Sequence, residues 1–212
     1  MKSNRVIAYI DGFNLYFGLK SKGWRCYYWL NLFLLCQQLV KSPQHLIQVK
    51  YFTSRITKAS PDKSKRQSTY IEALQTVPNI KIFYGKYVWS PSVCKSCGYS
   101  YEVPEEKMTD VQLAVEMVSD ASQDRYDTAF LIGGDIDQVP SIEVVRREFP
   151  HKRIVVIFPP GRTSDELRGT ANAYYHITEE ILKRSLFPLE IKKPTSYILR
   201  CPDRWRVPRE NC

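Results

Sequence analysis

The feature of this 212-residue sequence that most constrains its fold is a series of continuous apolar runs of strand length. They occupy residues 6–10, 46–54, 80–85, 128–134 and 153–160. Because the runs are continuous rather than alternating, each predicts a strand covered on both faces. Stretches with helical patterning lie between them, at residues 31–40, 64–77, 107–121 and 140–149. This alternation predicts an α/β three-layer sandwich with a mainly parallel central sheet and right-handed crossovers.

The rest of the chain suggests how it is organised. A chain of this length is most simply a single domain, which we expect over residues 1–187. Residues 87–106 contain two cysteines and break the alternation, so they are interpreted as an irregular excursion from that domain. Proline and basic residues dominate from residue 188 onward, which predicts a basic C-terminal tail over 188–212, packed along the surface or partly disordered.

Charge and hydropathy indicate the class of partner. No apolar stretch approaches the roughly 20 residues that cross a bilayer, and the N-terminus has no signal-peptide pattern, so we expect a cytoplasmic protein without membrane association. The formal net charge of +9 favours a polyanionic partner. Nucleic acid fits that charge better than an anionic membrane surface.

Acidic residues follow the predicted strands. Asp11 ends the first run, and Asp135 with Asp137 follows the run that closes on two glycines. Asp110 lies in the first turn of a predicted helix, beside an apolar stripe expected to face inward, formed by Val111, Ala114, Val115 and Val118. Taken singly, each aspartate has an ordinary explanation as a turn residue, a helix cap or an acid at a helix N-terminus.

Taken together, the four aspartates predict a shared site. In an open parallel sheet, ligands bind beyond the carboxyl ends of the strands, where the strand order reverses. Carboxylates gathered there would repel one another unless a cation or a bound proton intervened. An all-oxygen set of ligands suits Mg²⁺ or Mn²⁺.

The same segments resemble a known family. The motifs YIDGFNLYFG (9–18), EEKMTDVQLAVEMVSDA (105–121) and LIGGDIDQVPSIEVV (131–145) resemble, in this order, the NYN domain of the LabA-like or DUF88 group. That group is a branch of the PIN-like nuclease superfamily, and the resemblance covers most of residues 5–187. It implies a parallel sheet sandwiched by helices and a metal-dependent ribonuclease.

The resemblance also implies roles for single residues. Asp11, Asp110, Asp135 and Asp137 would hold one or two Mg²⁺ or Mn²⁺ ions that activate water for phosphodiester hydrolysis. Asn14 would orient a ligand or a bound water, with a helix N-cap as the alternative.

Two residues depart from the family pattern, which usually has a small residue between the last two acids and an aromatic or large apolar residue after them. Ile136 and Gln138 stand there instead, which puts the strength of turnover in question. The leading hypothesis is a metal-dependent nuclease, best described as a single-strand endoribonuclease. The alternative is a non-catalytic RNA-binding regulatory module on the same fold.

Basic and aromatic residues suggest how a nucleic acid would be held. Lys58, Lys63, Lys65 and Arg66 follow the second strand and Lys107 precedes Asp110, so all five are candidates for phosphate contacts, with a solvated surface as the alternative. Aromatic residues that would stack on unpaired bases, or pack in the core, follow Asp11: Phe13, Tyr16, Trp24, Tyr27, Tyr28 and Trp29. The family resemblance favours single-stranded RNA, DNA stays open, and the sequence gives no prediction of oligomeric state.

The six cysteines do not form the pattern of a disulfide framework. Cys94 and Cys97, in CKSCG, resemble one knuckle of a zinc ribbon. A structural zinc ion takes four ligands, and Cys201 and Cys212 would complete the set only if the tail folded back. We expect a reduced pair without metal, with a zinc site as the less favoured alternative.

Overall fold

A computed structural model of the protein describes residues 4–56, 60–193 and 197–206. The elements follow in this order: β1 (Asn4–Asp11), α1 (Gly12–Ser21), η1 (Arg25–Tyr27), α2 (Leu32–Gln37), β2 (Gln44–Thr53), α3 (Pro61–Leu74), β3 (Ile80–Tyr84), β4 (Lys86–Val93), β5 (Ser100–Lys107), α4 (Thr109–Ser122), β6 (Thr128–Ile132), η2 (Ile136–Gln138), α5 (Val139–Glu148), β7 (Arg153–Phe158), α6 (Asp165–Thr170), β8 (Ala173–His176), α7 (Glu179–Arg184), β9 (Glu190–Lys192), β10 (Ile198–Arg200) and η3 (Asp203–Trp205).

The centre of the fold is a six-stranded sheet in the order β3-β2-β1-β6-β7-β8, in which every neighbouring pair is parallel. The predicted fold class is therefore confirmed. The strand order reverses between β1 and β6, since the chain builds outward from β1 to β3 and then returns to place β6 on its other side. In sheets of this kind the crevice at that reversal is the usual place for a ligand.

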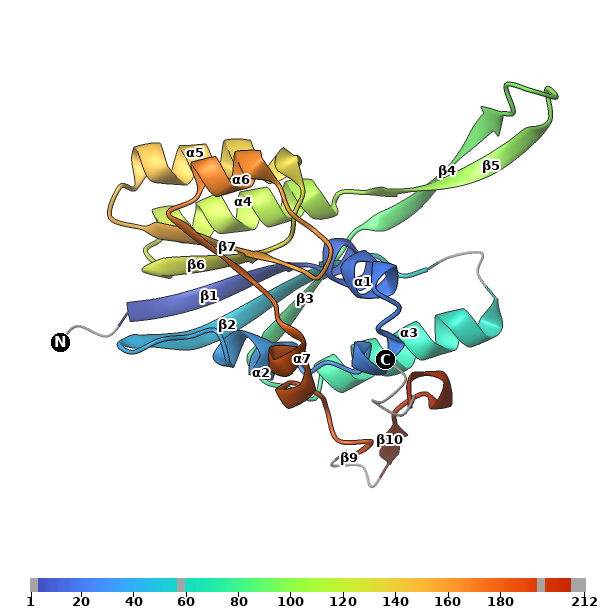
Figure 1. Ribbon diagram of the computed structural model, residues 1–212, viewed down its shortest axis with the longest axis horizontal. Helices are drawn as coiled ribbons and strands as arrows, with labels where there is room; N and C mark the ends of the chain where they lie inside the picture. Colours follow the sequence, from blue (N-terminus) through green and yellow to red (C-terminus); the bar gives the residue numbers. More distant parts are fainter. Residues whose placement is uncertain (1–3, 57–59, 194–196, 207–212) are drawn as a thin grey trace.

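Helices cover both faces of the sheet, as Figure 1 shows, with α4, α5 and α6 on one face and α1, α2, α3 and α7 on the other. The apolar residues of β1 supply both layers. Val6, Ala8 and Ile10 pack in the core beneath the second group of helices, whereas Ile7 and Tyr9 pack in the core beneath the first. Burial on both faces explains why the run is apolar without interruption.

Two sequence expectations about the fold need correction. The segment 87–106 is not irregular, because β4 and β5 pair as an antiparallel hairpin that projects from the body of the molecule (Figure 1). The inward stripe of α4 is formed by Leu113, Met117 and Ala121, whereas Val111 is 68% exposed and Val115 is 60% exposed. In the described part of the C-terminal segment, Leu199 in β10 and Cys201 in the turn after it are buried.

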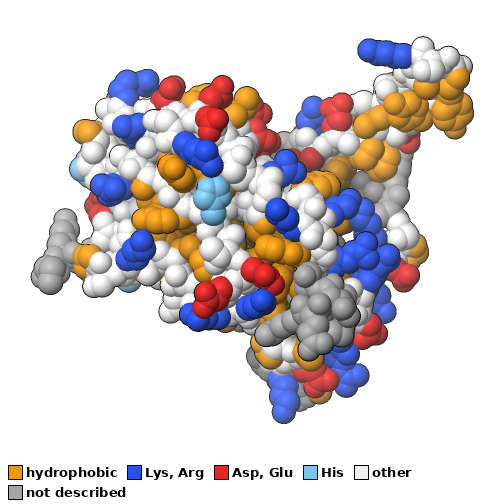
Figure 2. Space-filling model, viewed as in Figure 1, with side chains coloured by type: hydrophobic (Ala, Val, Ile, Leu, Met, Phe, Trp, Pro, Cys, Tyr) orange, Lys and Arg blue, Asp and Glu red, His pale blue; other side chains and the backbone are white. Residues whose placement is uncertain are grey.

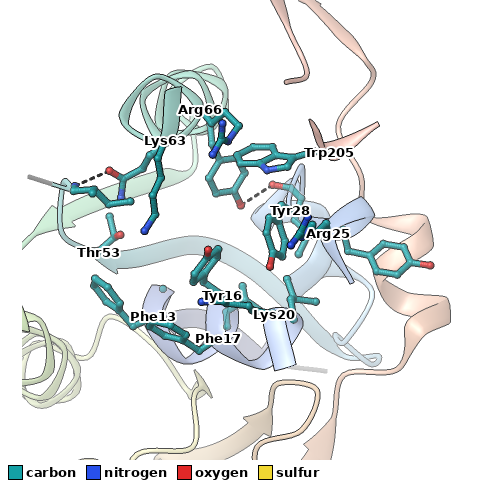
Figure 3. A pocket seen from close by; sticks show the side chains of 18 of the residues that line it. Phe13, Tyr16, Phe17, Lys20, Arg25, Tyr28, Thr53, Lys63, Arg66 and Trp205 are labelled. Carbon is teal, nitrogen blue, oxygen red and sulfur yellow. Dashed lines mark hydrogen bonds between the residues drawn. The ribbon is translucent and has the colours of Figure 1, made fainter. Parts of the chain in front are cut away.

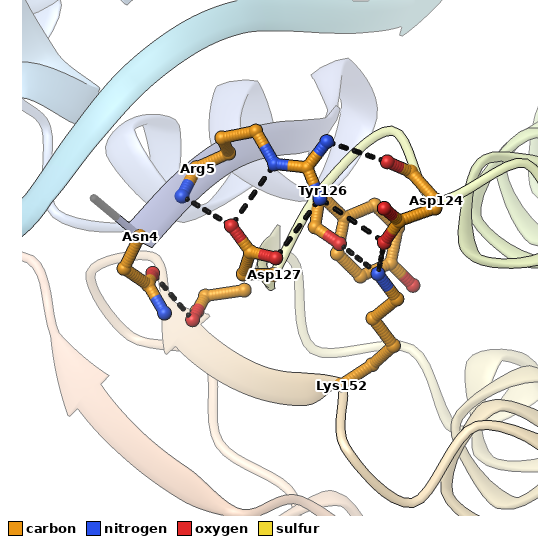
Figure 4. Close-up of polar contacts among 7 residues, drawn as sticks. Asn4, Arg5, Asp124, Tyr126, Asp127 and Lys152 are labelled. Atoms are coloured by element: carbon orange, nitrogen blue, oxygen red, sulfur yellow. Dashed lines mark hydrogen bonds and ion pairs between the residues drawn. The ribbon is translucent and has the colours of Figure 1, made fainter. Parts of the chain in front are cut away.

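Two polar clusters fix the sheet to its surroundings. At the amino ends of β1 and β6, Arg5 makes two contacts with the Asp127 carboxylate, at 3.0 and 2.9 Å, and Lys152 pairs with Asp124 (Figure 4). Beneath α4, the buried Lys50 ammonium lies 2.5 Å from Asp120 and 2.6 Å from Glu116. Tyr9 and Arg125 also donate to Asp120, so that carboxylate is fully surrounded by donors.

Within the described part of the chain, no helix is both long enough and apolar enough to cross a membrane.

Candidate active site

The predicted acidic residues lie at the carboxyl edge of the sheet, where the strand order reverses. Asp11 is the last residue of β1, and Asp135 and Asp137 follow the neighbouring strand β6 after two glycines. Asp110 reaches the same edge from the first turn of α4. Residues that are far apart in the sequence are therefore brought to one place by the topology.

Asp11 is buried, and it caps helix α1. One carboxylate oxygen accepts hydrogen bonds from the backbone N–H groups of Phe13 and Asn14, at 2.9 and 3.0 Å. The other oxygen accepts a hydrogen bond from the side-chain amide of Asn14 at 2.5 Å. Asn14 is thus not the N-cap, and it instead orients the carboxylate that fills that position. Gly12 is required between them, because a Cβ there would lie 2.6 Å from the carbonyl oxygen of Phe52.

Asp110, Asp135 and Asp137 form a compact group of carboxylates. Each offers an oxygen, and the three oxygens lie within 4.8 Å of one another. Asp11 is not a member of this group but is near enough to raise the pKa of Asp110, and both of its own oxygens accept hydrogen bonds from the start of α1. Among the described residues, this is the one cluster of three or more acidic, histidine or cysteine side chains with such spacing.

The electrostatics of the group favour a cation. Burial and the nearby Asp11 and Asp135 raise the pKa of Asp110 from 3.8 to about 7. Burial also raises the pKa of Asp11, although its hydrogen bonds from Asn14 and Phe13 oppose that change. A carboxylate whose charge is this unfavourable is stabilised by a divalent ion as well as by a proton. The donor set consists of carboxylate oxygens, so these residues fit Mg²⁺ or Mn²⁺.

Glu106 is a further acid that sequence reasoning missed. It lies near the end of β5, accepts hydrogen bonds from the hydroxyls of Ser54 and Thr109, and contributes to the raised pKa of Asp110. Between Glu106 and Asp110, Met108 adopts a left-handed backbone with φ of 86°, which costs a residue with a Cβ about 1–2 kcal/mol. The signal for Glu106 was its place in the EEKMTDV motif, but no periodicity marked it.

The two residues that depart from the family pattern have different surroundings. Gln138 is buried, and its side-chain amide donates to the backbone carbonyl of Asp110 at 3.2 Å. It therefore connects the turn that holds Asp135 and Asp137 to the helix that holds Asp110. Ile136 is 52% exposed and lines an open depression of about 340 Å³ together with Phe13, Asn14, Asp135 and Arg162.

Arg162 was also missed by sequence reasoning. It follows β7 in a turn, is exposed, and lines the same depression as Asp135. A guanidinium in that position can contact a phosphate whose neighbouring oxygens face a metal ion. No repeated pattern in PPGRTSDEL would have marked it.

The predicted basic residues do not act as one group. Lys63 and Arg66 line a pocket next to α1, whereas Lys65 on the same helix is exposed and does not line it. Lys107 ends β5 rather than beginning α4, and its ammonium pairs with Glu105 at 2.8 Å. Lys58 lies outside the described residues.

Cys94 and Cys97 lie at the turn of the β4–β5 hairpin, and both are free thiols. Cys201 is a buried free thiol whose S–H donates to the carbonyl of Pro202 at 3.7 Å. Within the described part of the chain no third ligand joins Cys94 and Cys97, so a zinc site completed by Cys201 is not formed there. Cys212 lies outside the described residues.

Comparisons with known proteins place these features in context. The sequence profile of the NYN domain family matches residues 5–179. The chain is 26% identical over 195 residues to 6-hydroxy-3-succinoylpyridine 3-monooxygenase HspA of Pseudomonas putida (strain DSM 28022 / S16), an alignment that covers 73% of this chain and 59% of that protein. The chain therefore spans less than two thirds of the length of that curated relative.

A solved structure supports the fold. The crystal structure of VPA0982, a protein of unknown function from Vibrio parahaemolyticus RIMD 2210633, matches with a TM-score of 0.58 at 17% identity. The match covers 88% of this chain and 100% of that chain. At this level of identity the likeness concerns the arrangement of the sheet and its helices, not the chemistry.

Proposed function

Because the chain belongs to the NYN domain family, we propose that it is a metal-dependent nuclease that hydrolyses phosphodiester bonds, preferentially as an endonuclease on single-stranded RNA. NYN domains are a branch of the PIN-like nucleases, which typically use divalent metals and bind nucleic acid. The observation that carries the proposal is the group of three carboxylates at the reversal of the sheet.

Asp110, Asp135 and Asp137 would hold a divalent ion, Mg²⁺ or Mn²⁺, with Asp11 as the fourth acid beside it. When bound, such an ion would lower the pKa of a coordinated water molecule and would neutralise negative charge at the phosphate. Two further residues would hold these acids in position. Asn14 fixes the orientation of the Asp11 carboxylate, and Gln138 fixes the start of α4.

Other side chains would position the substrate. Arg162 is placed to bind a non-bridging phosphate oxygen next to Asp135, since both line the same depression. Ile136 and Phe13 give that depression an apolar wall, which suits a sugar or a base better than a second phosphate. A histidine general base would not be required, because an ion held by Asp110, Asp135 and Asp137 would supply the acidification of the water.

Two other functions stand as alternatives. A non-catalytic RNA-binding module would keep the carboxylates and the basic surface but lack turnover, and Ile136 between the acids favours it. The relative from Pseudomonas putida is named as a monooxygenase, and oxygenation of a small aromatic compound would draw on an aromatic pocket such as the one next to α1. The carboxylate group favours the nuclease over both.

The test is cleavage of a labelled single-stranded RNA, beside a DNA of the same sequence, with Mg²⁺, Mn²⁺ or EDTA. The wild type is compared with Asp135→Asn and with a control, Glu143→Gln, which changes an exposed carboxylate on α5. We expect metal-dependent cutting that Asp135→Asn lowers at least 100-fold and that the control leaves unchanged. The RNA-to-DNA ratio gives the preferred substrate. RNA binding without cleavage under every metal condition would refute the nuclease and support the regulatory module.

A further inference from the structure

A pocket of about 370 Å³ lies between α1, η1, α3 and the C-terminal turn η3, shown in Figure 3. That volume is within the range of small-molecule and nucleotide sites. None of the grouped carboxylates, Asp110, Asp135 and Asp137, lines this pocket, so it is a second site rather than an extension of the acidic one. Its position is set by Gly12, Phe13, Tyr16 and Phe17, which follow Asp11 directly in the chain.

Among the described residues, the charge of the pocket lining is of one sign. These lining residues include five basic side chains and no carboxylate: Lys20, Arg25, Lys63, Arg66 and Arg204. Within the part of the chain that the structure describes, none of these five forms an ion pair with an acidic side chain. Figure 2 shows Lys and Arg side chains gathered below the hairpin, over α1 and the start of α3. Uncompensated cations that converge on one cavity favour an anionic ligand.

The pocket is also rich in aromatic rings that solvent can reach. Tyr16 and Tyr28 are half-buried, and their ring centroids lie 5.1 Å apart with the planes inclined at 51°. Phe17 is 40% exposed, and Trp205 from η3 packs edge-on against Tyr28. Neither Tyr16 nor Tyr28 makes a parallel-stacked contact with another described ring, and both stay partly open to solvent. The fully buried Tyr27, by contrast, serves the core.

The pocket adjoins the acidic site through one helix. Phe13 and Phe17 line both the pocket and the depression that contains Asp135 and Arg162. The backbone N–H of Phe13 is itself hydrogen-bonded to Asp11. A chain of nucleotides that places one phosphate at the acids would therefore pass over Phe13 toward the basic pocket.

We propose that this pocket binds one unpaired nucleotide of the strand being cut, with its base against Tyr16 and Tyr28 and a phosphate held by Lys63 and Arg66. This inference rests on the proposed nuclease function. Aromatic faces accept any base, and a base can enter only when it is not paired, so the pocket selects single strands without reading sequence. A small aromatic carboxylate shares part of this chemistry, but five cations fit a polyphosphate backbone better than one carboxylate.

The test measures equilibrium binding of a fluorescein-labelled eight-nucleotide single-stranded RNA in EDTA, where a metal-dependent nuclease does not cut. Tyr16→Ala is compared with Tyr99→Ala, which removes a 69% exposed tyrosine near the tip of the hairpin. Lys63→Ala is compared with Lys65→Ala, two residues along the same helix and outside the pocket. Nicotinate is added as a competitor in a separate series.

We expect Tyr16→Ala to weaken binding about 5- to 150-fold, the range found for loss of one stacked base. Lys63→Ala should weaken binding and lower the slope of log affinity against log salt by about 1, as for one lost phosphate contact. Both controls should stay within about twofold of the wild type. A duplex of the same sequence should bind more weakly than the single strand and lose little on Tyr16→Ala. Lys63 is exposed, so Lys63→Glu keeps the test decisive if Tyr16→Ala does not fold.

The outcomes separate the pocket from the catalytic proposal. If RNA is cut with metal but Tyr16 and Lys63 variants bind like their controls, the pocket proposal is wrong and the nuclease stands. If binding depends on Tyr16 and Lys63 but no metal supports cleavage, the pocket stands and the nuclease is wrong. Tight binding of nicotinate that depends on Tyr16, with RNA binding unaffected by it, would overturn the pocket proposal in favour of a small aromatic acid.

Discussion

Replacing Asp110 by asparagine should stabilise the metal-free protein while it removes a proposed metal ligand. The pKa of Asp110 rises from 3.8 to about 7, because of burial and the neighbouring acids. Each pH unit between these values corresponds to about 1.4 kcal/mol, which gives about 4 kcal/mol in full. Asp110 is half-buried, so solvent screens part of this cost, and we expect about 2 kcal/mol. For a chain of this size that is a rise in Tm of roughly 4–8 °C.

The protonated form of Asp110 determines how the free energy of unfolding depends on pH. The folded protein holds the Asp110 proton more tightly than the unfolded chain does, so this stabilisation is present below pH 4 and is lost as pH rises through about 7. In EDTA, the difference in free energy of unfolding between Asp110→Asn and the wild type should therefore grow from pH 5 to pH 8. Urea denaturation at several pH values measures it, with Glu143→Gln as the control.

Metal should reverse the order of stability of the wild type and Asp110→Asn. Mg²⁺ or Mn²⁺ that binds the folded state raises its stability with concentration, and the wild type should gain more than Asp110→Asn. The reasoning would be refuted if Asp110→Asn were no more stable than the wild type at pH 8 in EDTA, or if the difference did not change with pH. Either result would mean that the carboxylates do not crowd one another in solution.

Three further changes test the structure around the site. Lys50→Met leaves the buried Asp120 without its main partner, and urea denaturation should show a loss of about 3–5 kcal/mol. Met108→Gly relieves a left-handed backbone with φ of 86° and should raise stability by up to about 1 kcal/mol, seen as a higher midpoint in thermal unfolding. The Arg5 guanidinium holds the pKa of Asp127 well below its usual range, so Asp127→Asn should destabilise the protein at pH 7, and the difference from the wild type should shrink below about pH 4.

Much of the fold could be predicted from the sequence, because strands buried on both faces are written as uninterrupted apolar runs. The parts that were missed lack such a signal. β8 is four residues long at the edge of the sheet, and three of its residues are exposed. The β4–β5 hairpin stands away from the body, so neither face is buried and no periodicity develops.

Helix α4 shows how a buried charge misleads pattern reasoning. Two apolar stripes are available, and the one that contains Val111 and Val115 has no charged member. The helix instead turns Leu113, Met117 and Asp120 toward the sheet, since Lys50 on β2 provides a buried partner for that carboxylate. A pairing between residues 70 positions apart cannot be seen in local periodicity.

The candidate site was predictable only in part for a similar reason. The positions of Asp11, Asp135 and Asp137 at strand ends follow from the apolar runs, and the order of the sheet brings them together. Arg162 and Glu106 reach the same edge from a turn and from the base of the hairpin, where no pattern precedes them. The basic residues after β2 were predicted as a set. Lys63 and Lys65 lie on different sides of α3, and only Lys63 lines the pocket.

The structural role of Asp11 and its proposed functional role are compatible. As the cap of α1, its carboxylate accepts two backbone N–H groups from the positive end of the helix. Those bonds lower its pKa and so oppose the effect of burial, which raises it. They also fix the direction of the carboxylate, and the same turn sends Phe13 and Tyr16 into the aromatic pocket. The cap therefore links Asp11 to the proposed base-binding pocket through one helix.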